Sequence, residues 1–317
     1  MPPSSPRVLI IRLDAIGDAL ALVPLLGALK ACAIPVDIVF SSVNSDALAS
    51  PASINRYIGI DDPGLTAATY SHILIATEDA TAYNLARSLR APHRIGFYNG
   101  WGKPLKSLWL RTLLTEPHYR SAGLDPHTQH EVEVLFALGR SLLGEQARPS
   151  RNVEELTSLV IDKPMPADHR VAFQVTDKWE RLGIAFDQVL ELAQRCRDIA
   201  PMHWIAGSHE REYAQRFSAA IGCEITSFTS VIPWKATIAA SRALVAPDSG
   251  AIHVAGMTGV PTVAVFAPQK YLTAQTARWA PWAAPHTIIE AKQHWSAAGA
   301  AALTNLLSLA AQRNDTR

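Results

Sequence analysis

The sequence predicts an α/β protein made of two halves, each built around a parallel, doubly wound sheet. Short apolar segments rich in β-branched residues alternate with segments of helical periodicity, which is typical of β-α-β units. This alternation stops at a proline-containing passage over residues 148–166 and then starts again. The length of 317 residues is large for one core and ordinary for two domains.

The first half is expected to span residues 1–160. Its predicted strands are residues 7–13, 35–40 and 72–76, and its predicted helices are 19–31, a short one within 41–49, one ending at 89, and 130–144. Residues 96–128 mix aromatic, glycine and basic residues without a clear period, so we predict an irregular loop there.

The second half is expected to span residues 161–317. Its predicted strands are residues 170–175, 203–206, 225–228, 243–246 and 262–266, and its predicted helices are 185–200, 210–221, 233–241 and 297–311. The last of these helices either stays with its own half or packs back on the first half.

Composition narrows the class of protein. The 29 basic and 28 acidic residues give a net charge of +1, which does not indicate nucleic-acid binding. The three cysteines lack CxxC spacing, so we expect reduced side chains in a cytoplasmic protein and neither disulfides nor a zinc site. The N-terminal residues do not resemble a signal peptide, and no apolar run is long enough for a membrane helix.

The segment DSGAIHVAGMTGVPTVAVFAP, from Asp248 to Pro268, carries the most specific pattern in the second half. The first amides of a helix have no intrahelical partner, so Ser249 and Gly250 are expected to donate to an anion such as a diphosphate. Asp248 either orients this loop or caps the helix. His253 lies one turn further on, where it faces the same ligand or serves as a structural hydrogen-bonding group.

Two further polar residues follow the first predicted strand of the second half. The hydroxyl of Thr176 and the ammonium group of Lys178 are placed to reach phosphate oxygens. The alternative for Lys178 is a solvated surface side chain. Both residues are expected near Ser249, because the carboxyl ends of parallel strands lie at one edge of a sheet.

A second junction lies in the first half, where a strand ends in Asp14-Ala-Ile-Gly-Asp18. Gly17 is expected to allow a tight turn before the helix. Asp18 either caps that helix or accepts a proton from a substrate hydroxyl, and Asp14 adds a second carboxylate to the same loop.

Several other active-site patterns do not occur in the sequence. It contains no GxGxxG after the first strand, no Walker GxxxxGK[ST], no HExxH and no GxSxG. His127 and His130 lie three residues apart, but no neighbouring cysteines or carboxylates complete a metal site, so we expect none.

Together these residues resemble glycosyltransferase family 9, which includes the ADP-heptose:lipopolysaccharide heptosyltransferases. The similar blocks are VLIIRLDAIGDALALVPLLGALK near the start, RIGF at 94–97, HEVEVLFALGRSLLG at 130–144 and the Asp248–Pro268 segment. The resemblance implies a GT-B fold, with two Rossmann-like domains facing across a cleft. It also implies an inverting, metal-independent transfer of a sugar, heptose from ADP-heptose, onto a lipopolysaccharide core or related glycan.

The resemblance also assigns roles to residues. It makes Asp18 the general base, with Asp14, Gly17 and Arg94 on the acceptor side. It places Ser249, Gly250 and His253 at the donor diphosphate, with Asp248 beside them and Thr176 and Lys178 assisting. It implies no cofactor other than the nucleotide-sugar substrate.

The sequence departs from the family pattern on the donor side. Ile232 stands where the family commonly has a glutamate that binds the nucleotide ribose, and Gln174-Val175 replaces a glycine-rich start. Two alternatives therefore stay open: a GT-B-like protein that binds a nucleotide or glycan without catalysis, and another sugar-nucleotide enzyme such as an epimerase.

The basic loop of the first half also has two interpretations. Arg94, Lys103, Lys106 and Arg111 either contact acceptor phosphates or carboxylates or belong to an ordinary solvated loop. Trp101 and Trp109 are candidates for contact with the cytoplasmic face of the inner membrane, where the acceptor lies.

Overall fold

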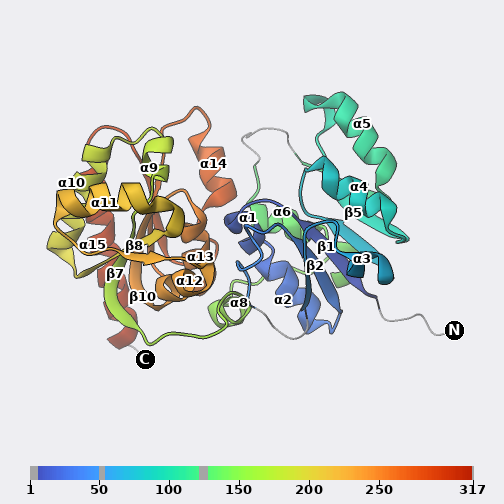
Figure 1. Ribbon diagram of the computed structural model, residues 1–317, viewed down its shortest axis with the longest axis horizontal. Helices are drawn as coiled ribbons and strands as arrows, with labels where there is room; N and C mark the ends of the chain where they lie inside the picture. The colour runs from blue at the N-terminus through green and yellow to red at the C-terminus, as the bar shows by residue number, and fades with distance from the viewer. Residues whose placement is uncertain (1–5, 50–53, 121–127, 316–317) are drawn as a thin grey trace. The chain divides into compact units, whose positions relative to one another are not determined.

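The computed structural model describes residues 6–49, 54–120 and 128–315 of the chain (Figure 1). The chain divides into two compact units, residues 1–151 and 152–317. The helix α8 (Val153–Val160) therefore belongs to the second unit, where it packs against α13 (Gly250–Thr258).

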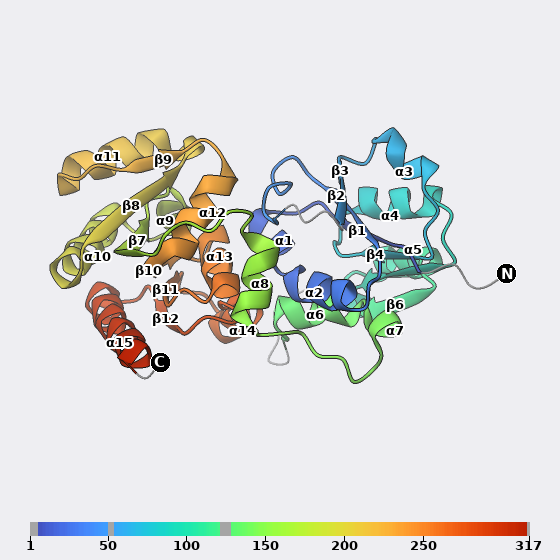
Figure 2. The ribbon, with the colours of Figure 1, turned by 90° about the horizontal axis from the view of Figure 1, so that it is seen from below.

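The first unit contains a six-stranded parallel sheet in the order β3-β2-β1-β4-β5-β6. Its strands are β1 (Val8–Arg12), β2 (Val36–Phe40), β3 (Ile54–Ile58), β4 (His72–Ile75), β5 (His93–Tyr98) and β6 (Glu116–Tyr119). Its helices are α1 (Ile16–Leu20), α2 (Val23–Ala31), α3 (Pro63–Ala67), α4 (Ala80–Ser88), η1 (Gly100–Gly102), α5 (Pro104–Leu113), α6 (Glu131–Ala137) and α7 (Arg140–Leu143). Figure 2 shows α2 and α6 on one face of this sheet and α3 and α4 on the other.

The second unit repeats the same topology, with a parallel sheet in the order β12-β11-β10-β7-β8-β9. Its strands are β7 (Asp168–Gln174), β8 (Met202–Gly207), β9 (Thr226–Phe228), β10 (Ser241–Pro247), β11 (Thr262–Phe266) and β12 (His286–Glu290). Its remaining helices are α9 (Lys178–Arg181), α10 (Phe186–Ile199), η2 (Ser208–Glu210), α11 (Arg211–Ile221), α12 (Val231–Ala240), α14 (Leu272–Trp279) and α15 (Trp295–Asp315).

Both sheets confirm the predicted parallel α/β class. In each, the strand order reverses beside the first strand, at β1/β4 in the first unit and at β7/β10 in the second. In open α/β sheets the crevice outside the carboxyl ends of the strands at such a point is where ligands bind. The topology thus places one candidate site in each unit.

The buried strands are apolar on both faces, because helices cover both sides of each sheet. In the second unit, Phe173, Trp179 and Phe217 join α15 in one core. Trp295 and Leu303 of α15 are buried there, and the helix packs against α10 and strands β10–β12. This packing accounts for the apolar face of the closing helix within its own unit.

The prediction of an irregular loop over residues 96–128 is wrong for a large part of the described residues. Pro104–Leu113 forms the helix α5, and Glu116–Tyr119 forms the edge strand β6. Pro104 occupies the first helical turn, where its missing N–H costs nothing, and Ser107 and Leu110 turn inward one helical turn apart. The short strands β3 and β12 at the sheet edges also lacked a strong apolar signal.

Candidate functional site

The candidate site of the second unit is built around the N-terminus of α13. Ser249 is the N-cap residue, yet its side chain makes no capping hydrogen bond. Its Oγ is buried and has no hydrogen-bond partner among the described atoms. An unpaired buried hydroxyl costs about 1–3 kcal/mol, so such groups are usually satisfied by a ligand or water. The hydroxyl and the first amides of α13, beginning at Gly250, form an anion-binding arrangement.

Lys178 supplies the positive charge of this site. It begins α9, directly after the carboxyl end of β7, and β7 is hydrogen-bonded to the strand that leads into Ser249. Burial raises the pKa of Asp248, and the nearby Lys178 ammonium group opposes that rise. Gln275 donates to the Asp248 carboxylate at 3.2 Å. The structure therefore brings together Lys178, Asp248, Ser249 and Gly250, as the sequence predicts.

Thr176 is placed differently from the prediction. Its side chain is buried, and its Oγ1 donates to Glu210 Oε1 at 2.5 Å while accepting from the Lys178 amide at 3.2 Å. The hydroxyl is thus occupied within the protein, and it shapes the loop that carries Lys178 instead of pointing a donor at a phosphate. Glu210 also accepts from the Asp177 amide at 2.8 Å.

Glu210 was missed by the sequence reasoning. The available signal was an acidic residue shortly after the strand at 203–206, at the same carboxyl edge of the sheet. A residue four positions beyond the end of that predicted strand is too far away for spacing alone to fix its contact. The structure joins them because β7 and β8 are adjacent.

His253 lies on the buried side of α13, in edge-on contact with the Trp279 ring at 5.7 Å between centroids. Burial, together with the charge of Lys178, lowers its pKa to about 4. The imidazole is therefore neutral near pH 7, which favours a hydrogen-bonding role over a charged one toward a diphosphate.

We expect His253 to make the protein less stable in mild acid. The pKa of His253 is lower in the folded state than the ordinary value near 6.5, so the unfolded chain binds the proton more readily. Stability is full above pH 6.5 and falls as the pH drops toward 4, by about 2 kcal/mol between pH 7 and pH 5. Urea unfolding at both pH values measures this loss.

His253→Gln is the control for that titration. The variant should lose about 2 kcal/mol less than the native protein between the same two pH values. Other groups, including Asp248, titrate in both proteins and cancel in the comparison. An equal pH dependence in the two proteins would show that His253 does not titrate as described.

The two positions that depart from the family pattern are near each other in space. Ile232 lies in the first turn of α12, with 44% of its surface exposed. Trp234, two residues later, donates its Nε1 to Gln174 Oε1 at 3.0 Å. An indole–amide pair therefore connects the start of α12, where Ile232 lies, with the carboxyl end of β7.

In the first unit, Asp18 is the third residue of α1, and Ala15 is the N-cap. One carboxylate oxygen of Asp18 accepts from the Ala15 amide at 3.2 Å, and the other accepts from Arg12 at 2.7 Å. Asp14 Oδ2 lies 3.4 Å from Arg12 Nε. Arg12 thus holds both predicted carboxylates at the carboxyl end of β1, beside the reversal of strand order.

Arg12 belongs to a chain of alternating charges that the sequence reasoning did not find. Its side chain is 1% exposed and lies 3.7 Å from Glu131, which is fully buried on α6. Glu131 accepts two hydrogen bonds from Arg120 at 2.9 and 3.0 Å, and Arg120 lies 3.6 Å from Glu78. The signal for Arg12 was a guanidinium inside an otherwise apolar strand, which can be buried only with partners.

Two predicted acceptor-side residues do not fit their expected positions. Gly17 lies within the first turn of α1, and its φ is not in the left-handed region, so no tight glycine turn is formed. Arg94 lies at the amino end of β5, the opposite edge of the sheet from Asp18. It donates to the carbonyl groups of Leu113 and Ala91 at 2.9 and 3.3 Å, and so secures the end of α5.

Of the two histidines considered for a metal site, the structure describes only His130. His130 is the N-cap residue of α6, and its Nδ1 accepts from the Val132 amide at 3.1 Å. His127 lies outside the described residues.

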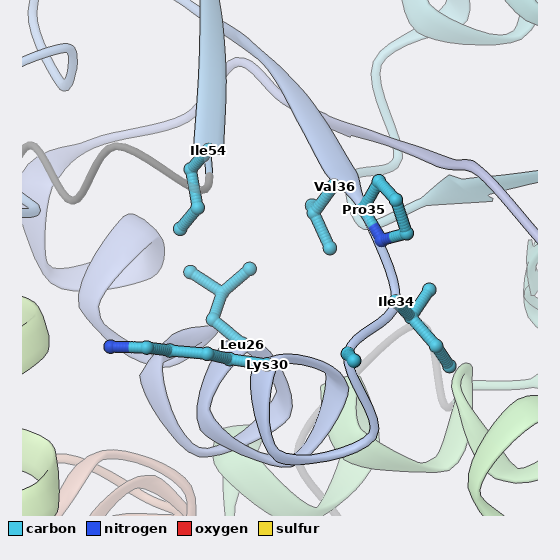
Figure 3. A pocket seen from close by; sticks show the side chains of 7 residues that line it. Leu26, Lys30, Ile34, Pro35, Val36 and Ile54 are labelled. Carbon is cyan, nitrogen blue, oxygen red and sulfur yellow. The ribbon is translucent and has the colours of Figure 1, made fainter.

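A cavity of about 240 Å³ in the first unit lies between α2 and the amino ends of β2 and β3 (Figure 3). Its walls are mostly apolar and include Leu26, Val36 and Ile54. It lies at the wrong end of the strands for Asp14 and Asp18 to reach it. We therefore assign the candidate site to the carboxyl edge and not to this cavity.

Comparison with known families gives a match to residues of the second unit. Residues 185–305 match the model described as "Glycosyltransferase family 9 (heptosyltransferase)". The matched range contains Asp248, Ser249, Gly250 and His253 but neither Thr176 nor Lys178. A search of curated proteins gave no match. The family match confirms the resemblance and the prediction of a glycosyltransferase.

Solved structures confirm the fold over both units. E. coli heptosyltransferase WaaC with ADP is 18% identical, covers 95% of this chain and 99% of its own, and has a TM-score of 0.72. E. coli ADP-heptose lps heptosyltransferase II is 14% identical, with coverages of 96% and 99% and a TM-score of 0.66. A family 9 glycosyltransferase from Veillonella parvula is 17% identical, with coverages of 92% and 87% and a TM-score of 0.64.

Proposed function

Because the chain is a glycosyltransferase similar to family 9, we propose that it transfers heptose from ADP-heptose to a lipopolysaccharide core or related glycan, with inversion and without a metal ion. The observation that carries this proposal is the uncapped N-terminus of α13. There the buried Ser249 hydroxyl has no partner in the described residues and Lys178 stands close by. This arrangement suits the diphosphate of a nucleotide-sugar.

The residues of the donor site are suited to stabilise the leaving group of the reaction. As the bond between the anomeric carbon and the diphosphate oxygen breaks, negative charge grows on the leaving nucleoside diphosphate. The amides at the start of α13, the Ser249 hydroxyl and the Lys178 ammonium group stabilise that charge. This is the task that a divalent ion performs in other transferases.

The residues of the acceptor site are suited to activate the attacking hydroxyl group. Asp18 accepts the proton of the acceptor hydroxyl as its oxygen attacks the anomeric carbon on the face opposite the leaving group. Arg12 fixes the orientation of the Asp18 carboxylate through the 2.7 Å hydrogen bond. In this proposal Asp14 shares the loop and is not itself the base.

The donor and acceptor in this proposal are those of proteins that this chain resembles. One similar structure is described as E. coli WaaC with ADP-2-deoxy-2-fluoro heptose, and another as an ADP-heptose lps heptosyltransferase. None of the described helices is long and apolar enough to cross a membrane. We place the protein in the cytoplasm, in peripheral contact with the inner membrane that carries its acceptor, with no nucleic-acid partner.

Turnover of ADP-heptose tests the function directly. The purified protein, incubated with ADP-heptose and a truncated lipopolysaccharide acceptor, should release ADP and add one sugar, with inverted anomeric configuration. Chelation of divalent ions should leave the rate unchanged. Binding of ADP without transfer or hydrolysis would identify a binding protein, and a rearranged donor formed without acceptor would identify an epimerase.

Lys178→Met should reduce the transfer rate strongly. Removal of one group that stabilises developing negative charge costs about 10²–10³ in kcat. Lys292→Met is the matched control, since Lys292 is exposed and paired with Glu290, and it should keep native turnover. Steady-state kinetics of both variants measure the effect. Native kcat in Lys178→Met would remove this residue from the diphosphate site.

A further inference from the structure

The helix α5 of the first unit is held in place along one side. Ser107 and Leu110 are buried, and Trp109 and Leu113 pack against the core formed with α4 and β5. The Trp109 and Tyr83 rings lie 6.3 Å apart. Of the two tryptophans expected at a membrane, Trp109 is therefore a packing residue. Figure 1 shows α5 alongside α4 at an edge of this unit.

The opposite side of α5 exposes large apolar side chains. Trp101 in η1 is 94% exposed, and Leu105 and Leu108 on α5 are 84% and 66% exposed. In the described part of the chain, these are the three most exposed large hydrophobic side chains. Tyr119, 63% exposed, lies beside Gly100 at the start of η1. Leu105 and Leu108 are three residues apart and so share one helix face.

Basic residues predominate in the segment that carries this surface. Residues 80–115 contain six basic residues and no acidic residue, in a chain whose net charge is only +1. Arg111 on α5 is exposed. Lys103 and Lys106 both approach Glu78, at 3.8 Å from its carboxylate and 2.8 Å from its carbonyl oxygen. The apolar surface is thus bordered by cations whose charge is only partly compensated.

We propose that Trp101, Leu105, Leu108 and Tyr119, with Lys103 and Arg111 at their border, form a docking surface for a bilayer that contains anionic lipids. Leucine and aromatic side chains insert into the boundary between headgroups and acyl chains. Basic residues next to them are attracted by the negative surface potential. We call this set the α5 surface.

Charge and size favour a bilayer over a protein partner. A stable protein–protein interface uses about 20–30 residues on each side, whereas the exposed apolar area here comes from four side chains. A bilayer needs no surface of complementary shape. Insertion of a few apolar side chains and the attraction of a positive rim to anionic lipids both strengthen binding to it. A second copy of this chain would bring the same positive charge and repel it.

Vesicle binding tests the α5 surface. The native protein should cosediment with phosphatidylcholine vesicles that contain phosphatidylglycerol, and much less with phosphatidylcholine alone or at high salt. The double variant Leu105→Glu/Leu108→Glu should partition about a hundredfold more weakly, because two leucines no longer enter the interface. Both positions are exposed, so the melting temperature should stay unchanged.

Leu309→Glu is the matched control, because Leu309 is an exposed leucine, at 54%, on the helix α15 of the second unit. It should keep native vesicle binding. The proposal is overturned if the native protein ignores anionic vesicles, or if the double variant binds them as well as the native protein does. Self-association that sedimentation velocity detects, and that only the double variant loses, would identify the surface as a contact between copies instead.

The vesicle measurement contains neither donor nor acceptor, so it does not depend on transferase activity. Only the biological reason for docking, a membrane-borne acceptor, rests on the proposed function. Vesicle binding without sugar transfer would support the α5 surface and contradict the proposed function. Transfer to a soluble acceptor fragment without vesicle binding would support the proposed function and contradict the α5 surface.

Discussion

Asp18→Asn is expected to reduce sugar transfer by about 10²–10⁴-fold, the usual contribution of a general base. Asparagine keeps the size of the side chain and an oxygen that accepts from Arg12, so the fold and the α1 N-terminus should survive. What the variant loses is the ability to take a proton from the acceptor hydroxyl. Steady-state kinetics with saturating donor measure the change in kcat.

Asp14→Asn is the control for this assignment. Asp14 stands on the same loop and also approaches Arg12, but its contact is longer, at 3.4 Å against 2.7 Å. It should lose less than about tenfold in kcat. ADP affinity should be native in both variants, since neither residue belongs to the donor site. A large loss in Asp14→Asn together with near-native turnover in Asp18→Asn would exchange the roles of the two carboxylates.

Arg12→Met should lower the free energy of unfolding by about 3–5 kcal/mol, the usual result of removing one partner from a buried charge pair. The variant removes the Arg12 charge from the fully buried Glu131, which keeps its contact with Arg120, and it frees Asp18 from its shortest hydrogen bond. We therefore expect a loss of transfer as well, because Asp18 no longer has a fixed orientation. Urea unfolding and kinetics measure the two effects.

Arg7→Met provides the comparison on the same N-terminal segment. Arg7 also pairs with a buried carboxylate, that of Asp37, at 2.7 Å, but its own side chain is 38% exposed against 1% for Arg12. Asp37 keeps hydrogen bonds from Asn55 and Tyr70 at 3.0 and 2.9 Å. The loss should be about 1 kcal/mol or less. Equal losses in the two variants would contradict the special position of Arg12.

Arg12→Lys separates charge from geometry. Lysine keeps the positive charge opposite Glu131 but lacks the planar guanidinium, whose Nε approaches Asp14 while its Nη2 reaches Asp18 and Glu131. Its stability should lie between those of the native protein and Arg12→Met. Its kcat should still fall, and an unchanged kcat would show that charge alone, without the fork, holds Asp18.

Strong periodicity made the central elements predictable. The apolar runs around Val8–Arg12, Val36–Phe40 and Thr262–Phe266 are buried on both faces and were recognised as strands. The edge strands β3, β6 and β12 are not predicted, because they carry polar residues and their alternation is weak. The interior strand β5 (His93–Tyr98) is not predicted either, since it is short and begins with His93 and Arg94. The α5 segment was hidden by the aromatic and glycine residues that precede its proline.

The donor-side residues were predictable because they are local. Asp248, Ser249 and Gly250 occupy one strand-to-helix junction, and Lys178 follows a neighbouring strand. Glu131 and Glu210 were not predictable as partners of Arg12 and Thr176, since these pairs are separated by more than thirty positions. Nothing in the spacing of a sequence fixes a contact between separate elements.

The two parallel α/β units and the two strand-to-helix junctions can be predicted from the sequence, because hydrophobic period and helix-start chemistry are local properties. Which polar atoms already have hydrogen-bond partners depends on the tertiary structure. In the structure, the Thr176 hydroxyl donates to Glu210, and Ser249 Oγ has no hydrogen-bond partner in the described residues. Arg94 lies at the amino ends of the strands, opposite the end where Asp18 lies. Burial and strand order control these outcomes, and both arise from packing between distant segments.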